Sequence, residues 1–218
     1  MSDLRAADRR ALARAQPEKL QRWPRTARRQ ARIRSVLARR QSDLTVVLEN
    51  VHDPHNVSAI LRSCDAVGVL RAHAVYTIEG PPPGAFARQT SASAAKWVDV
   101  DRHPSIVACY DRLHADGFLI LATSVGPDAH RLHDLDFTVP TALVFGNEMR
   151  GASDEARSLA DGLVEIPMMG MVQSLNVSVA CAVCLYEAFR QRDRTGGYNA
   201  PKLSEDALRV LEDDWLHR

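Results

Sequence analysis

A short strand, a pliable loop and a long helix follow one another in Leu163-Val-Glu-Ile-Pro-Met-Met-Gly-Met-Val-Gln-Ser-Leu-Asn-Val-Ser-Val-Ala-Cys-Ala-Val-Cys-Leu-Tyr-Glu-Ala-Phe-Arg190. Pro167 ends the strand because proline has no N–H for a ladder. We expect the helix to begin at the polar turn before Val177, with Gln173 or Ser174 at its cap. Beyond Asn176 its residues are small or apolar nearly all round, which is typical of a buried helix. The stretch therefore predicts a small-molecule pocket with one wall in the core.

Length and composition indicate a globular protein without a membrane span. The 218 residues are enough for one α/β domain with short appendages, and apolar residues make up 45% of them. No apolar run approaches the roughly 20 residues that cross a bilayer. The first residues lack the apolar core of a secretory signal, and four cysteines that read as reduced indicate a reducing compartment, expected to be the cytoplasm.

The cysteines do not have the spacing of a metal site. Cys181 and Cys184 form a C-x-x-C, but no second pair of cysteines or histidines completes a zinc set. We expect reduced core residues, and no bound metal, at all four positions: Cys64, Cys109, Cys181 and Cys184.

Basic residues are concentrated at one end of the chain. The first 41 residues contain 13 of the 28 Lys and Arg residues, and only 3 of the 27 Asp and Glu residues. Such asymmetry favours nucleic acid or an acidic membrane surface as a partner. The alternative is a solvated arm that pairs with the acidic body of the same or a neighbouring subunit. We expect a helix from Thr26 to Arg40, whose arginines suit phosphate contacts: Arg25, Arg28, Arg29, Arg32, Arg39 and Arg40.

Apolar strands alternate with helices through the rest of the chain. Strands are expected at residues 44–49, 72–78, 96–100, 118–122, 141–145 and 163–166. This alternation predicts an α/β fold with a mostly parallel sheet and helices on both faces. Ligands bind beyond the carboxyl ends of such strands, so residues 123–124, 146–148 and 166–168 should converge on one site. The chain lacks the glycine-rich loops of ordinary dinucleotide and nucleoside-triphosphate sites.

Three motifs give the chain a family resemblance. They are Asn56-Val-Ser-Ala-Ile-Leu-Arg62, Phe145-Gly-Asn-Glu-Met-Arg-Gly151 and Ile166-Pro-Met-Met-Gly-Met-Val-Gln-Ser-Leu-Asn176. In this order they resemble the motifs of the SpoU/TrmH branch of the SPOUT methyltransferases, over roughly residues 26–192. The resemblance implies a deep C-terminal trefoil knot that binds S-adenosylmethionine, and a homodimer. It also implies metal-free methyl transfer to the ribose 2′-hydroxyl of a guanosine in tRNA, expected to be guanosine 18 of the D-loop.

The resemblance also divides the chain and assigns its site residues. It implies a basic helical extension that contacts tRNA (1–41), a methyltransferase domain (42–192) and a tail with a helix (193–218). Positions that match or adjoin the donor site are Thr123, Gly146, Ile166, Met171 and Leu175. Positions that match the functional polar residues are Asn56, Arg62, Glu148, Ser174 and Asn176. In the family the counterpart of Arg62 is held to activate the hydroxyl. A guanidinium pKa above about 12 favours orienting the hydroxyl and stabilising the alkoxide instead.

Other interpretations of the same residues stay open. Asn56 could be a plain helix cap, and Arg62 could be a surface cation beside Asp65. The protein could methylate another tRNA or rRNA nucleotide, or bind RNA without turnover. A generic α/β enzyme acting on an acidic metabolite is the third alternative.

Overall fold

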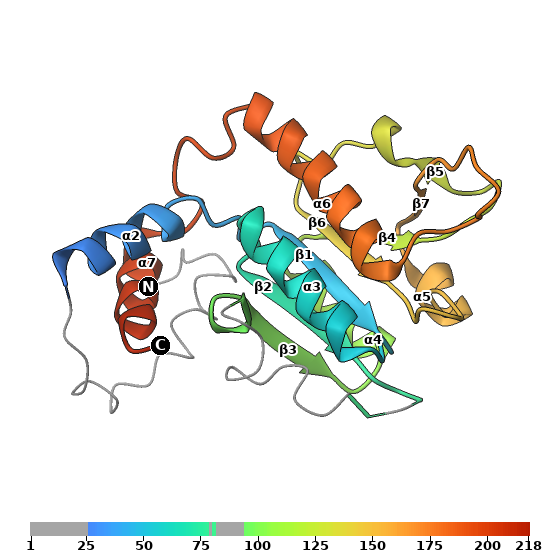
Figure 1. The fold of residues 1–218 in the computed structure, drawn as a ribbon, viewed down its shortest axis with the longest axis horizontal. Helices are drawn as coiled ribbons and strands as arrows, with labels where there is room; N and C mark the ends of the chain where they lie inside the picture. Colours follow the sequence, from blue (N-terminus) through green and yellow to red (C-terminus); the bar gives the residue numbers. More distant parts are fainter. Residues whose placement is uncertain (1–25, 79, 82–93) are drawn as a thin grey trace.

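The computed structural model describes residues 26–78, 80–81 and 94–218 (Figure 1). Residues 1–25 of the expected basic extension, which include the candidate Arg25, lie outside the described residues. Among the described helices, none combines the length and the apolar composition that spanning a bilayer requires.

A seven-stranded sheet forms the centre of the molecule, in the order β3-β2-β1-β6-β4-β7-β5. All of its strand pairs are parallel, which confirms the predicted fold class. The strands are β1 (Leu44–Glu49), β2 (Arg71–Val75), β3 (Asp99–His103), β4 (Leu119–Thr123), β5 (His130–Arg131), β6 (Thr141–Phe145) and β7 (Gly162–Glu165). The sequence did not predict β5, because two residues are too few for an apolar pattern.

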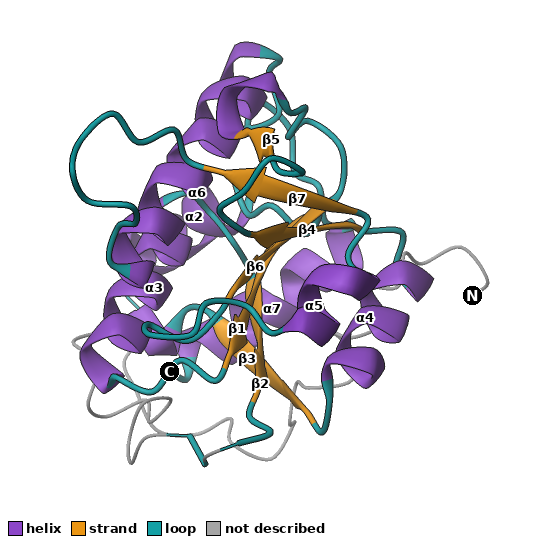
Figure 2. Ribbon diagram, turned by 90° about the vertical axis from the view of Figure 1, so that its right-hand side faces the viewer, coloured by secondary structure: helices purple, strands orange, loops and turns teal. Residues whose placement is uncertain are grey.

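Helices cover both faces of this sheet, as predicted (Figure 2). On one face lie α3 (Pro54–Ala66) and α6 (Val177–Arg194), packed side by side. On the other lie α4 (Ile106–Ala115) and α5 (Asp154–Leu159). The first and last described helices, α2 (Ala27–Leu37) and α7 (Glu205–Leu216), pack against each other beside the sheet. Two 3₁₀ turns complete the set, η2 (Ala94–Lys96) and η3 (Leu132–Asp134).

Each helical layer has its own apolar core. All six residues of β1 are buried, so its side chains supply both faces of the sheet. Leu48 packs with Ile60 and Leu185 beneath α3 and α6, whereas Val47 packs with Tyr110 beneath α4. A third cluster around Trp215 joins α2 to α7. Strands that are apolar on both faces thus required the three-layer arrangement.

Helix α6 differs from the prediction at its start and along one side. Its cap is Asn176, not Gln173 or Ser174, and the Asn176 side chain accepts hydrogen bonds from the N–H groups of the first turn. Cys181 and Leu185 are fully buried, but Val179 and Tyr186 are 47% and 54% exposed. The helix therefore has an apolar side that the described residues do not cover.

The four cysteines are buried free thiols, which confirms their predicted place in the core. Burial raises the pKa of Cys184 to about 12 and that of Cys181 well above its usual range. Both thiols of the C-x-x-C therefore stay protonated at neutral pH, which disfavours metal binding there.

A buried arginine fastens the end of α6 to the body of the domain. Arg192 is 1% exposed and donates to the carbonyl oxygens of Phe137 and Val139, both at 2.7 Å. It also forms an ion pair with Asp43. The tail that follows α6 is thus anchored by a charge that has no contact with bulk water.

Replacing Arg192 by Met should lower the free energy of unfolding by about 3 kcal/mol, because the two carbonyls lose their donor and Asp43 keeps Lys202 alone as an ion-pair partner. Urea unfolding followed by circular dichroism measures this. Arg194→Met, on the exposed side of the same helix, is the matched control and should change stability by less than about 0.5 kcal/mol. Equal effects of the two substitutions would contradict the role of Arg192.

Candidate functional site

The carboxyl ends of β1 and β6 meet where the order of strands along the chain reverses, which is where ligands bind in open α/β sheets. The side-chain amide of Asn147 donates to the carbonyl oxygen of Asn50 at 2.9 Å and joins the two ends. Asn50 has a φ of 52°, which asparagine tolerates. Its side-chain oxygen accepts from the N–H of Thr77, just beyond β2, at 2.9 Å. Three strand ends are therefore held together by two asparagines.

Gly146, between β6 and Asn147, makes this turn possible. A Cβ at this position would lie 2.0 Å from the backbone of Gly151 and 2.0 Å from that of Ala152. The turn folds back so closely that only glycine fits. The close approach expected at Gly146 is thus made by the chain's own backbone.

Glu148 is the centre of a hydrogen-bond network. Its carboxylate accepts from the side-chain amide of Asn56 at 3.0 Å, and from the backbone N–H groups of Asp53 and His52 at 3.1 and 3.3 Å. The amide of Asn176 in turn donates to the side-chain oxygen of Asn56 at 3.1 Å. The network connects the three motifs that the sequence analysis singled out.

Local structure explains why Asn56 is available for these bonds. Asp53 caps α3 and Pro54 occupies its first turn, so the helix begins two residues before Asn56. The interpretation of Asn56 as a plain cap is wrong. Asn56 is 8% exposed and points at Glu148 and Asn176 from within the first turn.

Hydrogen bonding decides the charge of Glu148. Burial alone would raise its pKa, but the bonds from Asn56 and from the backbone lower the pKa below the usual glutamate range. Nearby, the hydroxyl of Tyr76 donates to the carbonyl oxygen of Val51 at 2.8 Å. Burial, and then the Glu148 charge, raise the pKa of Tyr76 to about 12, so this hydroxyl keeps its proton.

The structure does not join Arg62 and Ser174 to the network. Arg62 lies two turns along α3 from Asn56 and is exposed, and the described residues offer it no hydrogen bond or ion pair. Asp65 pairs with Arg40, so Arg62 is an exposed cation without an ion pair to Asp65, and the interpretation of Arg62 as a surface cation stays open. Ser174 is likewise exposed and makes no hydrogen bond with the described residues.

The predicted donor residues lie at or near the ends of three adjacent strands. Thr123 ends β4 and donates to the carbonyl oxygen of Val144 in β6 at 2.9 Å. Ile166 follows β7 and is half-buried, as is Leu175. Met171 is 99% exposed, on a loop without regular secondary structure. The predicted convergence of these strand ends is confirmed, since β6, β4 and β7 are neighbours in the sheet.

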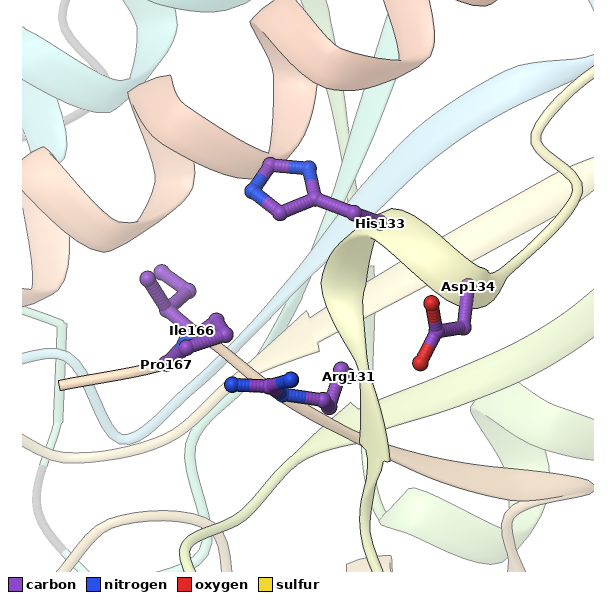
Figure 3. A pocket seen from close by; sticks show the side chains of 5 residues that line it. All are labelled: Arg131, His133, Asp134, Ile166 and Pro167. Carbon is purple, nitrogen blue, oxygen red and sulfur yellow. The ribbon is translucent and has the colours of Figure 1, made fainter.

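A hollow of about 260 Å³ opens beside Ile166 and Pro167 (Figure 3). The guanidinium of Arg131 extends toward these two residues, and His133 and Asp134 complete the wall. Of the predicted site residues only Ile166 lines it, and the Glu148 network does not. Its volume is below the 300–1,000 Å³ typical of small-molecule pockets.

Comparison with known proteins places these features in one family. Residues 43–186 match the SpoU rRNA Methylase family. The chain belongs to this family. It is 51% identical over 194 residues to the tRNA (guanosine(18)-2′-O)-methyltransferase of Thermus thermophilus, covering 89% of this chain and 98% of that protein.

Solved structures agree with this SpoU-family assignment. The A. aeolicus TrmH/SpoU tRNA modifying enzyme superposes with a TM-score of 0.78 at 39% identity, over 87% of this chain and 95% of that one. The SpoU methyltransferase AviRb of Streptomyces viridochromogenes, in complex with the cofactor AdoMet, superposes with a TM-score of 0.62 at 30% identity. That match covers 72% of this chain and 62% of AviRb.

The basic extension of this SpoU-family chain is only partly a surface for phosphates. Arg28, Arg29, Arg32 and Arg39 are exposed on or just after α2, which Thr26 caps as predicted. Arg40 is not available: it is 1% exposed, pairs with Asp65 and stacks 5.0 Å from the centre of the Trp215 ring. The prediction that Arg40 contacts RNA is therefore wrong. Helix α2 ends at Leu37, and the pattern of charges along the sequence does not show that Arg40, beyond this end, enters the core.

Several groups that build the site were not among the residues predicted from the sequence. Asn50, Asn147 and the backbone of His52 and Asp53 hold Glu148 and the strand ends. The Asp-Pro pair was a usable signal for the start of α3. No sequence signal points to the backbone donors, since these depend on how the turn is folded.

Asn56→Asp should destabilise the protein in a pH-dependent way. At pH 8 the new carboxylate would face Glu148 where an amide donor stood, which should cost about 1 kcal/mol because the pair is partly exposed. When two carboxylates face each other, the pKa of one of them is raised in the folded state. That carboxylate gains a proton as the pH falls toward 5, so the loss of stability should shrink. The parent behaves oppositely, since stability from the lowered Glu148 pKa is lost on acidification. Denaturant unfolding at several pH values measures the difference, with exposed Asn199→Asp as a control that should show no such trend.

Proposed function

We propose that this protein transfers a methyl group from S-adenosylmethionine to the ribose 2′-hydroxyl of guanosine 18 in tRNA. The observation that carries the proposal is the network of Glu148, Asn56 and Asn176, which joins the three motifs of a SpoU-family chain. The name of a relative 51% identical over 194 residues supports the choice of tRNA and of guanosine 18.

The methyl donor is proposed to lie at the ends of β4, β6 and β7. The residues there fit such a ligand: Ile166 and Leu175 offer half-buried apolar surface, and Met171 is an exposed, adaptable side chain on an irregular loop. Thr123 and Gly146 complete the proposed lining. When bound, S-adenosylmethionine supplies an electrophilic methyl group. A relative in this family has been crystallised with that cofactor, which supports the proposal.

Arg62 is proposed to act on the RNA side of the reaction. Its guanidinium is exposed, and the described part of the chain gives it no partner, so it is available to a phosphate or a ribose. Because a guanidinium offers hydrogen-bond donors and no acceptor, Arg62 would orient the hydroxyl and stabilise the developing alkoxide. Asn56, Glu148 and Asn176 are proposed to fix the shape of the site, with Ser174 placing the loop before α6. Alignment of oxygen, methyl and sulfur is then the main contribution to the rate.

We propose that the enzyme works as a cytoplasmic homodimer. The uncovered apolar side of α6, with Val179 and Tyr186, supports a partner of the same kind. The family resemblance adds a deep trefoil knot in the C-terminal part of residues 42–192, with residues 1–41 and 193–218 as extensions. The exposed arginines of α2 are proposed to contact tRNA phosphates.

The second candidate is methylation of another nucleotide, in tRNA or in rRNA. The description of the matching family, SpoU rRNA Methylase, favours keeping rRNA as a substrate class. A binding protein without turnover is less well supported, because the Glu148 network is intact.

The deciding experiment incubates the protein with unmodified tRNA transcripts and radiolabelled S-adenosylmethionine, and then maps the labelled nucleotide. We expect 2′-O-methylguanosine at position 18. Label at another nucleotide would replace the proposed specificity, and no label in tRNA with intact donor binding would point to rRNA or to binding alone.

Arg62→Ala should abolish turnover with donor affinity unchanged, and Arg194→Ala is the matched control. A large loss of donor affinity in Arg62→Ala would contradict its place on the RNA side.

The arginines of α2 should set the salt dependence of tRNA binding. Arg28 and Arg32 are exposed and one helical turn apart, so they lie on one face. Replacing both by Gln should weaken binding and flatten the slope of log K against log salt by about 1.5–2, since each lost phosphate contact removes nearly one unit. Filter binding at several salt concentrations measures the slope. The double variant Arg112→Gln with Arg194→Gln removes the same charge elsewhere. An equal change of the salt slope in that variant would leave α2 with a structural role only.

A further inference from the structure

A group of metal-ligating side chains lies outside the proposed active site. Among the described residues it is formed by His73 of β2, His103 of β3 and Cys109 of α4, whose donor atoms all lie within 4.8 Å of one another. The Nδ1 atom of His73 and the Nε2 atom of His103 are 2.9 Å apart. His73 precedes His103 by 30 positions, and only the fold brings it to the other two residues.

The register of the sheet explains why they meet. His73 pairs with Asp101 and Val75 pairs with His103, so both histidines point to the same face of the sheet. Helix α4 covers that face, and its cap at Ser105 places Cys109 in the first turns above the strands. His73 is 2% exposed and Cys109 is fully buried, whereas His103, at the carboxyl end of β3, is half-buried.

We propose that His73, His103 and Cys109 form a binding site for one zinc-like divalent ion. Two imidazoles and a thiolate are ligands that zinc prefers. The neighbouring carboxylate of Asp101 lies 2.7 Å from Arg71 and is held in that ion pair. A donor set of nitrogen and sulfur disfavours magnesium and calcium, which require oxygen ligands.

The donor atoms must shift in two directions to hold such an ion, since one pair is closer than a bound ion requires and the others lie within 4.8 Å of one another. Zinc at about 2.0–2.1 Å from nitrogen and about 2.3 Å from sulfur keeps tetrahedral donor atoms about 3.3–3.6 Å apart. The imidazole nitrogens would therefore separate by a few tenths of an ångström from their present 2.9 Å. The proton that the two rings share moves to the outer nitrogen of its ring, and the thiol releases one proton to solvent. Half-buried His103 leaves a water molecule access to the fourth position.

An ion there would fasten the outer strands of the sheet to α4. It would also support the end of β2 that lies toward the proposed active site. Tyr76, three residues after His73, donates a hydrogen bond from its hydroxyl to the carbonyl oxygen of Val51, in the turn after β1. The ion takes no part in methyl transfer as proposed above, so the two proposals are independent. The C-x-x-C of α6, where no bound metal is expected, lies in a different helix, so the proposal departs from the expectation of a metal-free cysteine only at Cys109.

The test uses the full chain, treated with a chelator and then titrated with Co²⁺ as a spectroscopic probe for zinc. We expect one Co²⁺ per chain, a charge-transfer band from the thiolate, and displacement of both by Zn²⁺. Cys109→Ala should remove the band, while Cys184→Ala, which also removes a buried thiol, should keep it. His103→Gln should weaken the affinity at least tenfold and serves if Cys109→Ala does not fold.

A second readout is the thermal unfolding midpoint. Zn²⁺ should raise it with increasing concentration in the parent and in Cys184→Ala, but not in His103→Gln, because only a folded-state site gives this linkage. Failure to bind Co²⁺, binding without a thiolate band, or a band that survives in Cys109→Ala would each overturn the proposal.

Discussion

One carboxylate holds the candidate site in shape. Glu148 accepts a side-chain amide and two backbone N–H groups, and all three of these donors come from the segment between β1 and the first turn of α3. Because every donor is directed at the charge, the carboxylate stays ionised and the segment has no alternative partner of equal strength. The orientation of Asn56, and through it that of Asn176 and the start of α6, depends on this interaction. A neutral group at position 148 would satisfy fewer of the donors.

The rigid network lies next to surfaces that the chain leaves uncovered. Arg62 has no partner among the described residues, the loop of Met169 and Met171 is 85–99% exposed at these side chains, and α6 exposes Val179 and Tyr186. These surfaces suit three different ligands. The charge of Arg62 suits a phosphate or a ribose, the adaptable methionine loop suits the methyl donor, and the apolar side of α6 suits a second subunit. The hollow beside Ile166 is too small for a whole ligand by itself. We therefore expect the complete site to form only when those ligands assemble on the rigid frame.

Burial separates arginines and cysteines that look alike in sequence. Arg28 and Arg40 belong to the same basic run, yet one is exposed and the other is packed against Trp215 and Asp65. Cys184 is an inert core thiol, whereas Cys109, equally buried, lies against two imidazoles. In both cases the chemistry of the side chain is decided by what the fold places within a few ångströms.

The sequence by itself determined the architecture. Apolar runs such as Leu44–Glu49 and Thr141–Phe145 must be buried on both faces, so a covered parallel sheet follows from pattern alone, and Thr26, Ser105, Ser153 and Ser204 mark where helices start. The motifs also indicated which polar residues matter. Only the tertiary structure decided that Asn56 bonds to Glu148, that Arg40 is buried, and that His73, His103 and Cys109 meet. The physical reason is range: propensity and periodicity act over a few residues, whereas these contacts depend on strand register and on elements 30 to 120 positions apart.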